Sequence, residues 1–266
     1  MRLPHHLNSL APSLLILAAL AAPAAYAQDA RDVAPTGSLR VAVGVGPAPS
    51  PFWATRDRAS GKLRGVTVEL GKAAAERLGV PLQLVEYPNS GEIAAAADKN
   101  AWDISFMPAS PERGRFVDQG PAYVAYASGY LVRAGSDIRA VADVDRPGMR
   151  VGVIEGTGTA RAVANDVKQA ALASFPRADT AVDAIGKGEL DALAMGMEAV
   201  KDLSRKLPGT KVLDEVIHST GVVVVVPKGH AAAADWAARF IEGAKADGTV
   251  RRALDVSGFP QEKVAE

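Results

Sequence analysis

An arginine stands at an unfavourable place in the segment Ser110–Phe116, which has the sequence SPERGRF. Ser110, Pro111 and Glu112 are typical of a first helical turn, because they supply a capping hydroxyl, a suitable φ and a negative charge. The dipole of such a helix opposes the charge of Arg113 by about 0.3 to 1 kcal/mol. Arg113 therefore either points into solvent or faces an anion, and it is the first candidate for binding a negatively charged ligand.

A second anion-binding candidate is the turn Gly156–Thr159, with the sequence GTGT, between an expected strand and an expected helix. Free backbone N–H groups and hydroxyls at such a turn lie beyond the carboxyl edge of a sheet. The turn is not a dinucleotide-binding fingerprint, because Arg161 replaces the third glycine, and the chain contains no Walker motif. A tight turn that is capped by a threonine and binds no ligand is the alternative.

Residues for catalysis or metal binding are scarce. The chain has no cysteine and four histidines, of which two lie in the leader described below and two are far apart in sequence. No His-x-x-x-His pair indicates zinc, and no Gly-x-Ser-x-Gly motif indicates a hydrolase. A carboxylate pair drawn from Glu69, Glu155 and Glu198 could perform acid–base chemistry, but solvated or capping roles are the simpler interpretation. We expect no catalytic residue, metal or cofactor.

Residues 1–27 match a secretory signal peptide. Arg2 precedes the apolar run Leu10–Ala22, and Ala25-Tyr26-Ala27 forms an A-x-A cleavage site. We expect cleavage near Ala27 and export, with an uncleaved anchor as the alternative. No later run reaches the roughly 20 apolar residues of a membrane helix, so no membrane insertion is expected after cleavage.

The charge of the chain gives no argument for a nucleic-acid partner or an anionic membrane. It has 30 basic and 30 acidic residues, and loss of Arg2 with the leader leaves 29 and 30, a net charge of −1. Without cysteine, the chain tolerates an oxidising compartment but forms no disulfide there. The roughly 239 residues after the leader are enough for one large core or two smaller ones.

Weak internal sequence repeats indicate two α/β lobes of related fold rather than one sheet. Residues 39–44 (LRVAVG) and 149–154 (MRVGVI) both read as short buried parallel strands. A longer echo, of a helix, a turn and a strand, places Asp103 and Asp191 in equivalent positions. The repeated strands and helices predict a mainly parallel sheet in each lobe.

The other patterns place individual elements. Helical spacing covers Val66–Leu78 and ends at Gly79, and Leu82–Tyr87 alternates as a strand. A helix is expected over Ala160–Leu172 after the glycine-threonine turn. Five valines within Gly221–Pro227 predict a strand buried on both faces.

We expect the chain to cross between the lobes twice. Lobe 1 should comprise residues 36–128 and 221–262, and lobe 2 residues 132–217. The crossings, near Tyr126–Arg133 and Ile217–Val222, would lie side by side and form a hinge of two segments.

Eight short motifs follow one another along the chain. They are Pro51-Phe52, Gly61–Leu70, Trp102–Ile104, Ser110–Arg113, Pro121–Tyr123, Gly156-Thr157, Gly188–Ala192 and Asp247–Thr249. Their order and spacing resemble those of family 3 periplasmic solute-binding proteins, the receptors of polar amino-acid ABC importers. The resemblance covers almost the whole chain after the leader. It implies the α/β type II periplasmic binding protein fold, in which two lobes close over one small ligand.

The resemblance also implies a ligand site. The residues expected to hold a ligand carboxylate are Arg113, Ser110, Thr157 and Gly158. Phe52 and Trp53 would lie near the aromatic wall of the family's site. The positive charge of Arg113 at the start of its turn would then be explained by the binding of a ligand anion.

Two departures from the family pattern concern the substrate. Gly196 occupies the position of the aspartate that usually receives the ligand ammonium. Pro108 occupies the position of a serine or threonine that usually precedes the arginine. An ammonium without a partner would cost several kcal/mol, comparable with the roughly −8 kcal/mol of a micromolar affinity. Either Glu198, Glu155 or Glu69 replaces the aspartate, or the ligand lacks an α-ammonium.

We therefore expect a monomeric periplasmic receptor that captures a small carboxylate-bearing solute, an amino acid or a related organic acid. It would deliver this ligand to an ABC permease in the inner membrane and would not be an enzyme. Two alternatives stay open. One is a periplasmic enzyme of the same fold, similar to cyclohexadienyl dehydratases, and the other is a sensor or accessory module without a transport role.

Overall fold

The computed structural model describes residues 28–46 and 50–266. The expected signal peptide, residues 1–27, and its cleavage site lie outside this part. Within the described ranges, no helix combines the length and the apolar character needed to cross a membrane.

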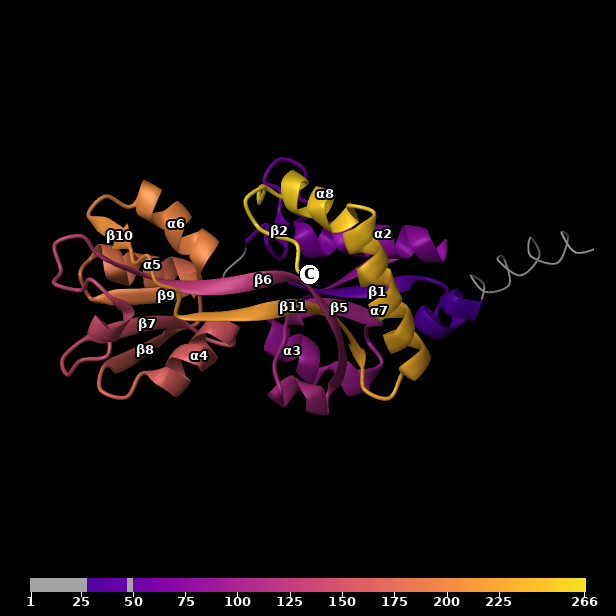
Figure 1. Cartoon of the computed structure of the whole chain (residues 1–266), viewed down its shortest axis with the longest axis horizontal. Helices are drawn as coiled ribbons and strands as arrows, with labels where there is room; N and C mark the ends of the chain where they lie inside the picture. Colours follow the sequence, from indigo (N-terminus) through magenta and orange to yellow (C-terminus); the bar gives the residue numbers. More distant parts are fainter. Residues whose placement is uncertain (1–27, 47–49) are drawn as a thin grey trace, which may run out of the picture.

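Strands and helices alternate along most of the chain (Figure 1). The strands are β1 (Leu39–Gly44), β2 (Thr55–Arg56), β3 (Leu63–Arg64), β4 (Leu82–Tyr87), β5 (Ile104–Pro108), β6 (Val117–Arg133), β7 (Arg150–Ile154), β8 (Ala171–Phe175), β9 (Ala192–Gly196), β10 (Thr210–Val212) and β11 (His218–Pro227). The helices are α2 (Val66–Leu78), α3 (Ser90–Ala95), α4 (Gly158–Asp166), α5 (Ala178–Gly186), α6 (Met197–Lys206), α7 (Ala231–Ala246) and α8 (Thr249–Val256). Short 3₁₀ turns are η1 (Ala97–Lys99), η2 (Glu112–Arg115) and η3 (Val141–Asp143).

One sheet runs through both lobes, in the order β4-β1-β5-β11-β6-β9-β7-β8, and β10 also pairs with β6. Lobe 1 contains β1, β4 and β5 with α2, α3, α7 and α8, and lobe 2 contains β7 to β10 with α4 to α6 (Figure 1). The pairs among β1, β4 and β5 and among β7, β8 and β9 are parallel, whereas β5–β11, β6–β9 and β6–β10 are antiparallel. The expectation of two separate sheets is corrected, because β6 is long enough to pair with β11 beside lobe 1 and with β9 and β10 in lobe 2.

The strands β6 and β11 connect the lobes side by side. They are antiparallel, and His218–Val222 pairs with Val124–Ser128. The remainder of β6 continues into lobe 2, where Ser128–Val132 pairs with β9. Two adjacent backbone segments therefore join the lobes.

Most of the elements predicted from the sequence are confirmed. The helix Val66–Leu78 has the predicted bounds, and Gly79 ends it in the left-handed region at φ 68°. The predicted helix over Ala160–Leu172 is too long, because α4 ends at Asp166. The carboxylate of Asp145 accepts hydrogen bonds from the N–H groups of the three residues 168–170 and so directs the chain into β8.

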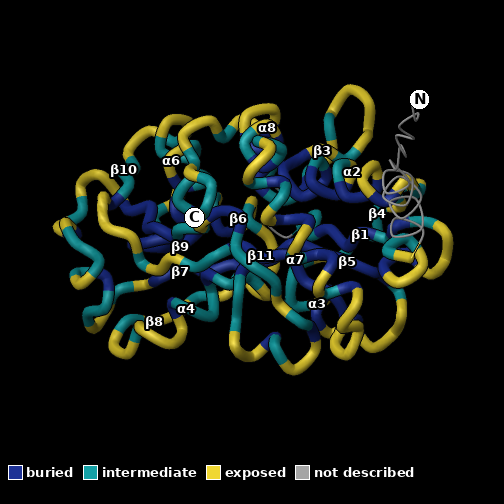
Figure 2. The backbone as a smooth tube through the Cα atoms, turned by 45° about the vertical axis from the view of Figure 1, so that its right-hand side comes forward, coloured by how far each residue is buried: buried dark blue, intermediate teal, exposed yellow. Residues whose placement is uncertain are grey.

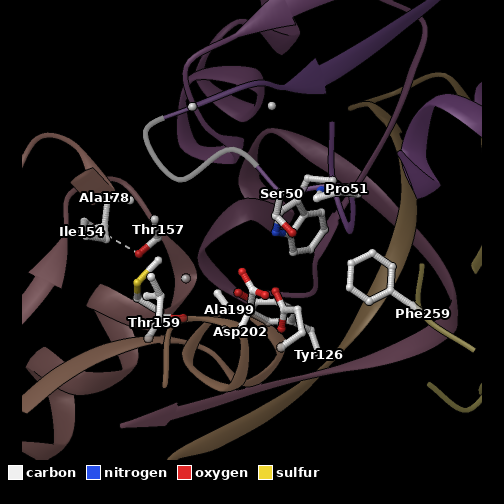
Figure 3. A pocket seen from close by; sticks show the side chains of 18 of the residues that line it. Ser50, Pro51, Tyr126, Ile154, Thr157, Thr159, Ala178, Ala199, Asp202 and Phe259 are labelled. Carbon is white, nitrogen blue, oxygen red and sulfur yellow. Dashed lines mark hydrogen bonds between the residues drawn. The ribbon is translucent and has the colours of Figure 1, made fainter. Parts of the chain in front are cut away.

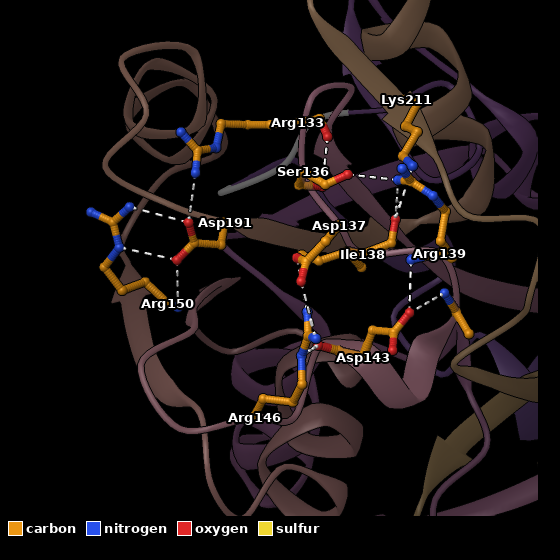
Figure 4. Close-up of polar contacts among 11 residues, drawn as sticks. Arg133, Ser136, Asp137, Ile138, Arg139, Asp143, Arg146, Arg150, Asp191 and Lys211 are labelled. Atoms are coloured by element: carbon orange, nitrogen blue, oxygen red, sulfur yellow. Dashed lines mark hydrogen bonds and ion pairs between the residues drawn. The ribbon is translucent and has the colours of Figure 1, made fainter.

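The internal repeat corresponds to the same arginine–aspartate contact in both lobes. In lobe 1, the backbone N–H of Arg40 donates to Asp103 at 2.7 Å, and the guanidinium pairs with the same carboxylate. In lobe 2, Arg150 repeats both contacts with Asp191, with an N–H distance of 2.9 Å (Figure 4). Asp191 also pairs with Arg133. The equivalence of the two aspartates that the sequence predicts is confirmed.

The apolar core follows the sheet through the molecule (Figure 2). In lobe 1, Trp236 and Phe240 of α7 pack with α2 on one face of the strands. Trp102 and Ile93 pack on the other face. Both faces of the lobe 2 strands are likewise covered by buried side chains. The strands are thus fixed by burial on two sides, and their carboxyl ends face the space between the lobes.

Candidate ligand-binding cleft

A cleft of about 1020 Å³ lies between the two lobes. Figure 3 shows Thr157 and Thr159 of lobe 2 on one side and Ser50 and Phe259 of lobe 1 on the other. A smaller cavity of about 480 Å³ adjoins the cleft. The residues that line both spaces are Pro108, Tyr126, Gly158 and Thr159. The two spaces therefore form adjacent parts of one site.

Arg113 lines the smaller cavity and is only 5% exposed. Its guanidinium donates to the carbonyl oxygen of Pro108 and to Oγ of Ser90, both at 2.7 Å. Burial lowers the pKa of Arg113 to about 10, and the positive charge of Arg161 acts in the same direction. No carboxylate pairs with Arg113 among the described residues. The guanidinium is held in place by neutral groups and retains its positive charge at neutral pH.

The sequence predicted the start of an α-helix around Arg113, and this prediction is wrong. The segment is a single 3₁₀ turn, Glu112–Arg115, and the side chain of Ser110 does not cap it. The backbone of Ser110 instead exchanges hydrogen bonds with the side chain of Gln119 at 3.0 and 2.9 Å. The turn stops because β6 begins at Val117. Ser110 itself lines the smaller cavity with Arg113.

The glycine-threonine turn begins α4, as predicted. Thr157 caps the helix, because its hydroxyl oxygen accepts from the N–H of Ala160 at 3.1 Å. The N–H groups of Gly158 and Thr159 have no acceptor among the described residues. Both residues line the cleft and the smaller cavity. Two unused donors at a helix N-terminus thus lie beside the cavity that contains Arg113.

The two lobes touch at this turn. A side chain at Gly156 would place its Cβ 2.5 Å from Nδ2 of Asn89, and the φ of 71° also favours glycine. The side chain of Asn89 caps α3 by accepting from the N–H groups of Gly91 and Glu92. Gly158 lies near the ring of Pro108, 3.8 Å from the position of an added Cβ. Close contact between the lobes therefore depends on a glycine at position 156.

Glu198 lines the large cleft at the start of α6. A Cβ added at Gly196 would lie 2.7 Å from its carboxylate and would also collide with the hydroxyl of Tyr126. The carboxylate of Glu198 therefore lies beside the place where a side chain of residue 196 would project. Burial raises the pKa of Glu198 to about 7, and the nearby Glu262 acts in the same direction. No ion pair neutralises Glu198 within the part of the chain that the structure describes.

The other two acidic candidates lie elsewhere. Glu69 is paired with Lys72 at 2.7 Å and does not line the cleft. Glu155 is exposed and is also absent from the lining. Of the three carboxylates considered from the sequence, only Glu198 faces the space between the lobes.

An aromatic cluster forms one wall of the cleft. Trp53, Tyr126 and Phe259 line it, and Phe52 is buried behind them at 5.0 to 5.3 Å between ring centroids. Gly65 admits this arrangement, because a Cβ there would collide with the carbonyl oxygens of the loop that carries Trp53. Trp53 thus contacts the cleft directly, whereas Phe52 supports the wall.

Sequence reasoning missed two contributors to the cleft. Tyr126 lies in the predicted crossing segment, but its position on β6 was not recognised as part of the site. The segment Ser257–Glu262 after the last helix also lines the cleft. It is held by Arg251, which donates to the carbonyl oxygens of Phe259 and Glu262. The only sequence signal is the aromatic residue beside Gly258 in an otherwise polar tail.

Among the described residues no group of three potential metal ligands is brought together. The arrangement instead combines a buried cation, free N–H donors, a half-buried carboxylate and aromatic rings. Such a site can hold a small molecule that carries both an anionic and a cationic group.

Comparisons with known proteins concern the family and the fold of the chain. The sequence profile of the bacterial extracellular solute-binding proteins, family 3, matches residues 41–255. A search of curated proteins gave no match. Among solved structures, the solute receptor for L-cysteine of Neisseria gonorrhoeae is 23% identical with a TM-score of 0.76, covering 89% of this chain and 98% of that chain.

Two further structures are similar. An ancestral arginine-binding protein bound to arginine is 25% identical with a TM-score of 0.71, over 84% of this chain and 98% of that chain. An ancestral amino acid-binding protein, described as a precursor of cyclohexadienyl dehydratase, is 23% identical with a TM-score of 0.73, over 85% of this chain and 96% of that chain.

Proposed function

Because the chain belongs to family 3 of the bacterial extracellular solute-binding proteins, we propose that it captures a small α-amino acid or a close analogue between its two lobes. Arg113 and the free N–H groups of Gly158 and Thr159 bind the ligand carboxylate. Glu198 binds the ligand ammonium, and Trp53 contacts the remainder of the ligand.

One observation carries this proposal. Within the described ranges, the carboxylate of Glu198 and the guanidinium of Arg113 have no counter-ion, and they border adjacent parts of one site. Arg113 is buried and Glu198 is half-buried, so leaving either charge without a partner is costly, and a zwitterionic ligand supplies a partner for both. A neutral or purely anionic ligand would leave Glu198 uncompensated.

The position of Glu198 supports a ligand that carries an α-ammonium over a ligand that lacks one, the alternative that the sequence left open. Its carboxylate borders the space next to Gly196, the position at which the family resemblance implies an aspartate for the ammonium. The longer glutamate side chain reaches this space from two residues further along the chain. Gly196 is required there, because a larger residue would displace both Glu198 and Tyr126.

Matched ligands test the proposal. We expect L-alanine, L-serine and L-aspartate to bind at least tenfold more tightly than L-lactate, L-glycerate and L-malate, which replace the ammonium with a hydroxyl, in calorimetric titrations. Glu198→Gln should remove this preference, because a neutral amide cannot neutralise an ammonium. Glu69→Gln is the matched control, since Glu69 lies outside the cleft, and it should leave the preference unchanged.

Two results would contradict the proposal. The hydroxy acids could bind as tightly as the amino acids, or Glu198→Gln could keep the preference of the wild-type protein. Thermal unfolding of each variant checks that a lost preference does not reflect a lost fold.

We further infer that the protein works outside the inner membrane as the receptor of an ABC importer. Membership of an extracellular family supports this location, and the N-terminal sequence supports export with cleavage near Ala27. The closed, loaded receptor would be the form recognised by the permease. Stimulation of the ATPase of a reconstituted permease by the loaded receptor, and not by an Arg113→Gln variant, tests this role.

One observation also favours a second candidate function. The pKa of Glu198, raised to about 7 by burial, suits a carboxyl group that donates a proton at neutral pH. A solved relative is described as a precursor of a dehydratase. A dehydratase of cyclic acids would hold its substrate carboxylate at Arg113, and Glu198 would protonate the departing hydroxyl so that it leaves as water. The adjacent C–H bond would break at the same time, its electron pair forming the new double bond and its proton passing to solvent. Incubation with cyclic hydroxy acids would then raise product absorbance with the wild-type protein and not with Glu198→Gln.

A further inference from the structure

A second arginine borders the site from lobe 2. Arg161 lies one turn into α4 and lines the smaller cavity. A Cβ added at Gly158 would lie 3.8 Å from Nη2 of Arg161. The same Cβ would lie 3.8 Å from the ring of Pro108 in lobe 1. The guanidinium of Arg161 therefore lies at the boundary between the lobes.

Arg161 has no visible counter-ion. Its side chain is half-buried and forms no hydrogen bond or ion pair with any described residue. Burial lowers its pKa, as expected of a cation that has lost water without gaining a partner. A surface arginine that simply extended into solvent would not be desolvated in this way.

Arg161 and Arg113 share one cavity and repel each other. The charge of Arg161 is one reason for the lowered pKa of Arg113. Two acidic residues, Glu112 and Asp166, also line the cavity, but neither lies within ion-pair distance of either arginine. Glu112 is exposed and acts on both arginines only at longer range.

The remaining polar groups of the cavity increase the positive potential. The free N–H groups of Gly158 and Thr159 point from the same helix N-terminus that carries Arg161 one turn later. Ser110 and Thr220 add hydroxyl groups without charge, and His218 adds no negative charge. A single carboxylate would neutralise one of the two guanidinium groups and leave the other desolvated.

We propose that Arg113 and Arg161 together bind two negatively charged groups of the ligand, so that the ligand is an amine with a second acid group beside its carboxylate. This inference rests on the proposed function and narrows its ligand class to acidic or phosphorylated amino acids. Arg161 is then a residue that determines specificity, because it comes from lobe 2 and meets the second acid group as the lobes come together.

Pairs of nearly isosteric ligands test the inference. Calorimetry would compare L-aspartate with L-asparagine, L-glutamate with L-glutamine, and O-phospho-L-serine with L-serine. The wild-type protein should bind the acidic member of at least one pair tenfold or more tightly than its neutral partner. The pair with the largest ratio distinguishes a second carboxylate from a phosphate group.

Variants assign the preference to Arg161. Arg161→Gln should reduce the acidic-to-neutral ratio at least tenfold while changing the affinity for the neutral member less than threefold. Arg161→Lys should keep part of the ratio, because it retains the charge but loses the planar donor pair. Arg239→Gln, on an exposed arginine outside both cavities, should change neither affinity.

Three outcomes would overturn the inference. Neutral amino acids could bind as tightly as their acidic counterparts. Arg161→Gln could weaken both members of a pair equally, which would make Arg161 a contact between lobes rather than a ligand-binding residue. Failure of all six ligands to bind would also overturn the inference, whereas binding of L-alanine in the same titrations would leave the proposed function standing.

Discussion

A buried cation and a half-buried carboxylate border the proposed site at the scale of single residues. Arg113 is fixed by Ser90 and Pro108, and Glu198 lies against the space beside Gly196. Both side chains lose water without gaining an ionic partner within the described chain. Such charges are expensive to maintain in a folded protein, which is the reason to assign them to ligand binding.

The raised pKa of Glu198 predicts how affinity depends on pH. A bound ammonium favours the ionised carboxylate, so the pKa of Glu198 falls when ligand binds, and binding below pH 7 must release a proton. The association constant should therefore decrease as pH falls below about 7, approaching tenfold per pH unit. Calorimetry between pH 5 and 8 measures this dependence.

Glu198→Gln provides the control for the pH series. Its affinity should be lower at pH 8 and should change little between pH 5 and 8, because the amide does not titrate. A wild-type affinity that stays constant over this range, or a variant that keeps the wild-type slope, would contradict the role of Glu198.

The sequence singled out the cation of the proposed site more sharply than its carboxylate. Arg113 could be found because a cation at the start of a turn conflicts with local electrostatics. Glu198 stayed one of three candidates, since the choice depends on which carboxylate the fold turns toward the cleft. Tyr126 gave no local signal at all, because its position in the cleft follows from the register of β6 against β11.

At the scale of elements, the turn before α4 controls how closely the lobes approach. Gly156→Ala should weaken ligand binding at least tenfold, because its Cβ would lie 2.5 Å from Nδ2 of Asn89. It should also lower the free energy of unfolding by about 1 kcal/mol, since φ is 71°. Calorimetry and urea unfolding measure the two effects.

Gly158→Ala is the matched control for this turn. The nearest atoms to its added Cβ are 3.8 Å away, which is ordinary contact, and the N–H group is retained. Its ligand affinity should stay within threefold of the wild-type value. Equal losses in the two variants would show that the turn tolerates no side chain at all and would remove the argument from the contact with Asn89.

The repeated arginine–aspartate contact predicts unequal stabilities in the two lobes. The side chains of Arg40 and Asp103 are 12% and 4% exposed, whereas those of Arg150 and Asp191 are 46% and 12% exposed. Asp103→Asn should lower the free energy of unfolding by about 3 kcal/mol, and Asp191→Asn by about half as much. Urea unfolding of both variants gives the comparison, and a larger loss for Asp191→Asn would contradict the dependence on burial.

Predictions of elements succeeded where the pattern is local and periodic. The helix α2 and the strands β1 and β4 have the bounds expected from their apolar spacing. The segment Ser257–Glu262 could not be predicted as a cleft wall, because its place depends on Arg251 and on a backbone contact between Ala265 and Tyr123. The single sheet also escaped prediction, since the echo between lobes does not reveal the length of β6.

At the scale of the whole molecule, the lobes are joined by two antiparallel strands and touch again at the turn near Gly156. A hinge of paired strands can bend while keeping its hydrogen bonds, and a ligand that contacts both lobes favours the closed arrangement. Arg113 belongs to lobe 1, whereas Glu198 and the donors of α4 belong to lobe 2. A zwitterion bound by all of them therefore links binding to closure.

The most direct measurement is the affinity of Arg113→Gln for the tightest amino-acid ligand, determined by calorimetry beside Arg239→Gln. Loss of the charged, doubly hydrogen-bonded guanidinium should weaken binding at least 100-fold, while circular dichroism stays that of the folded protein and the control binds as the wild-type protein does. An Arg113→Gln variant that is folded and binds this ligand with unchanged affinity would contradict the account.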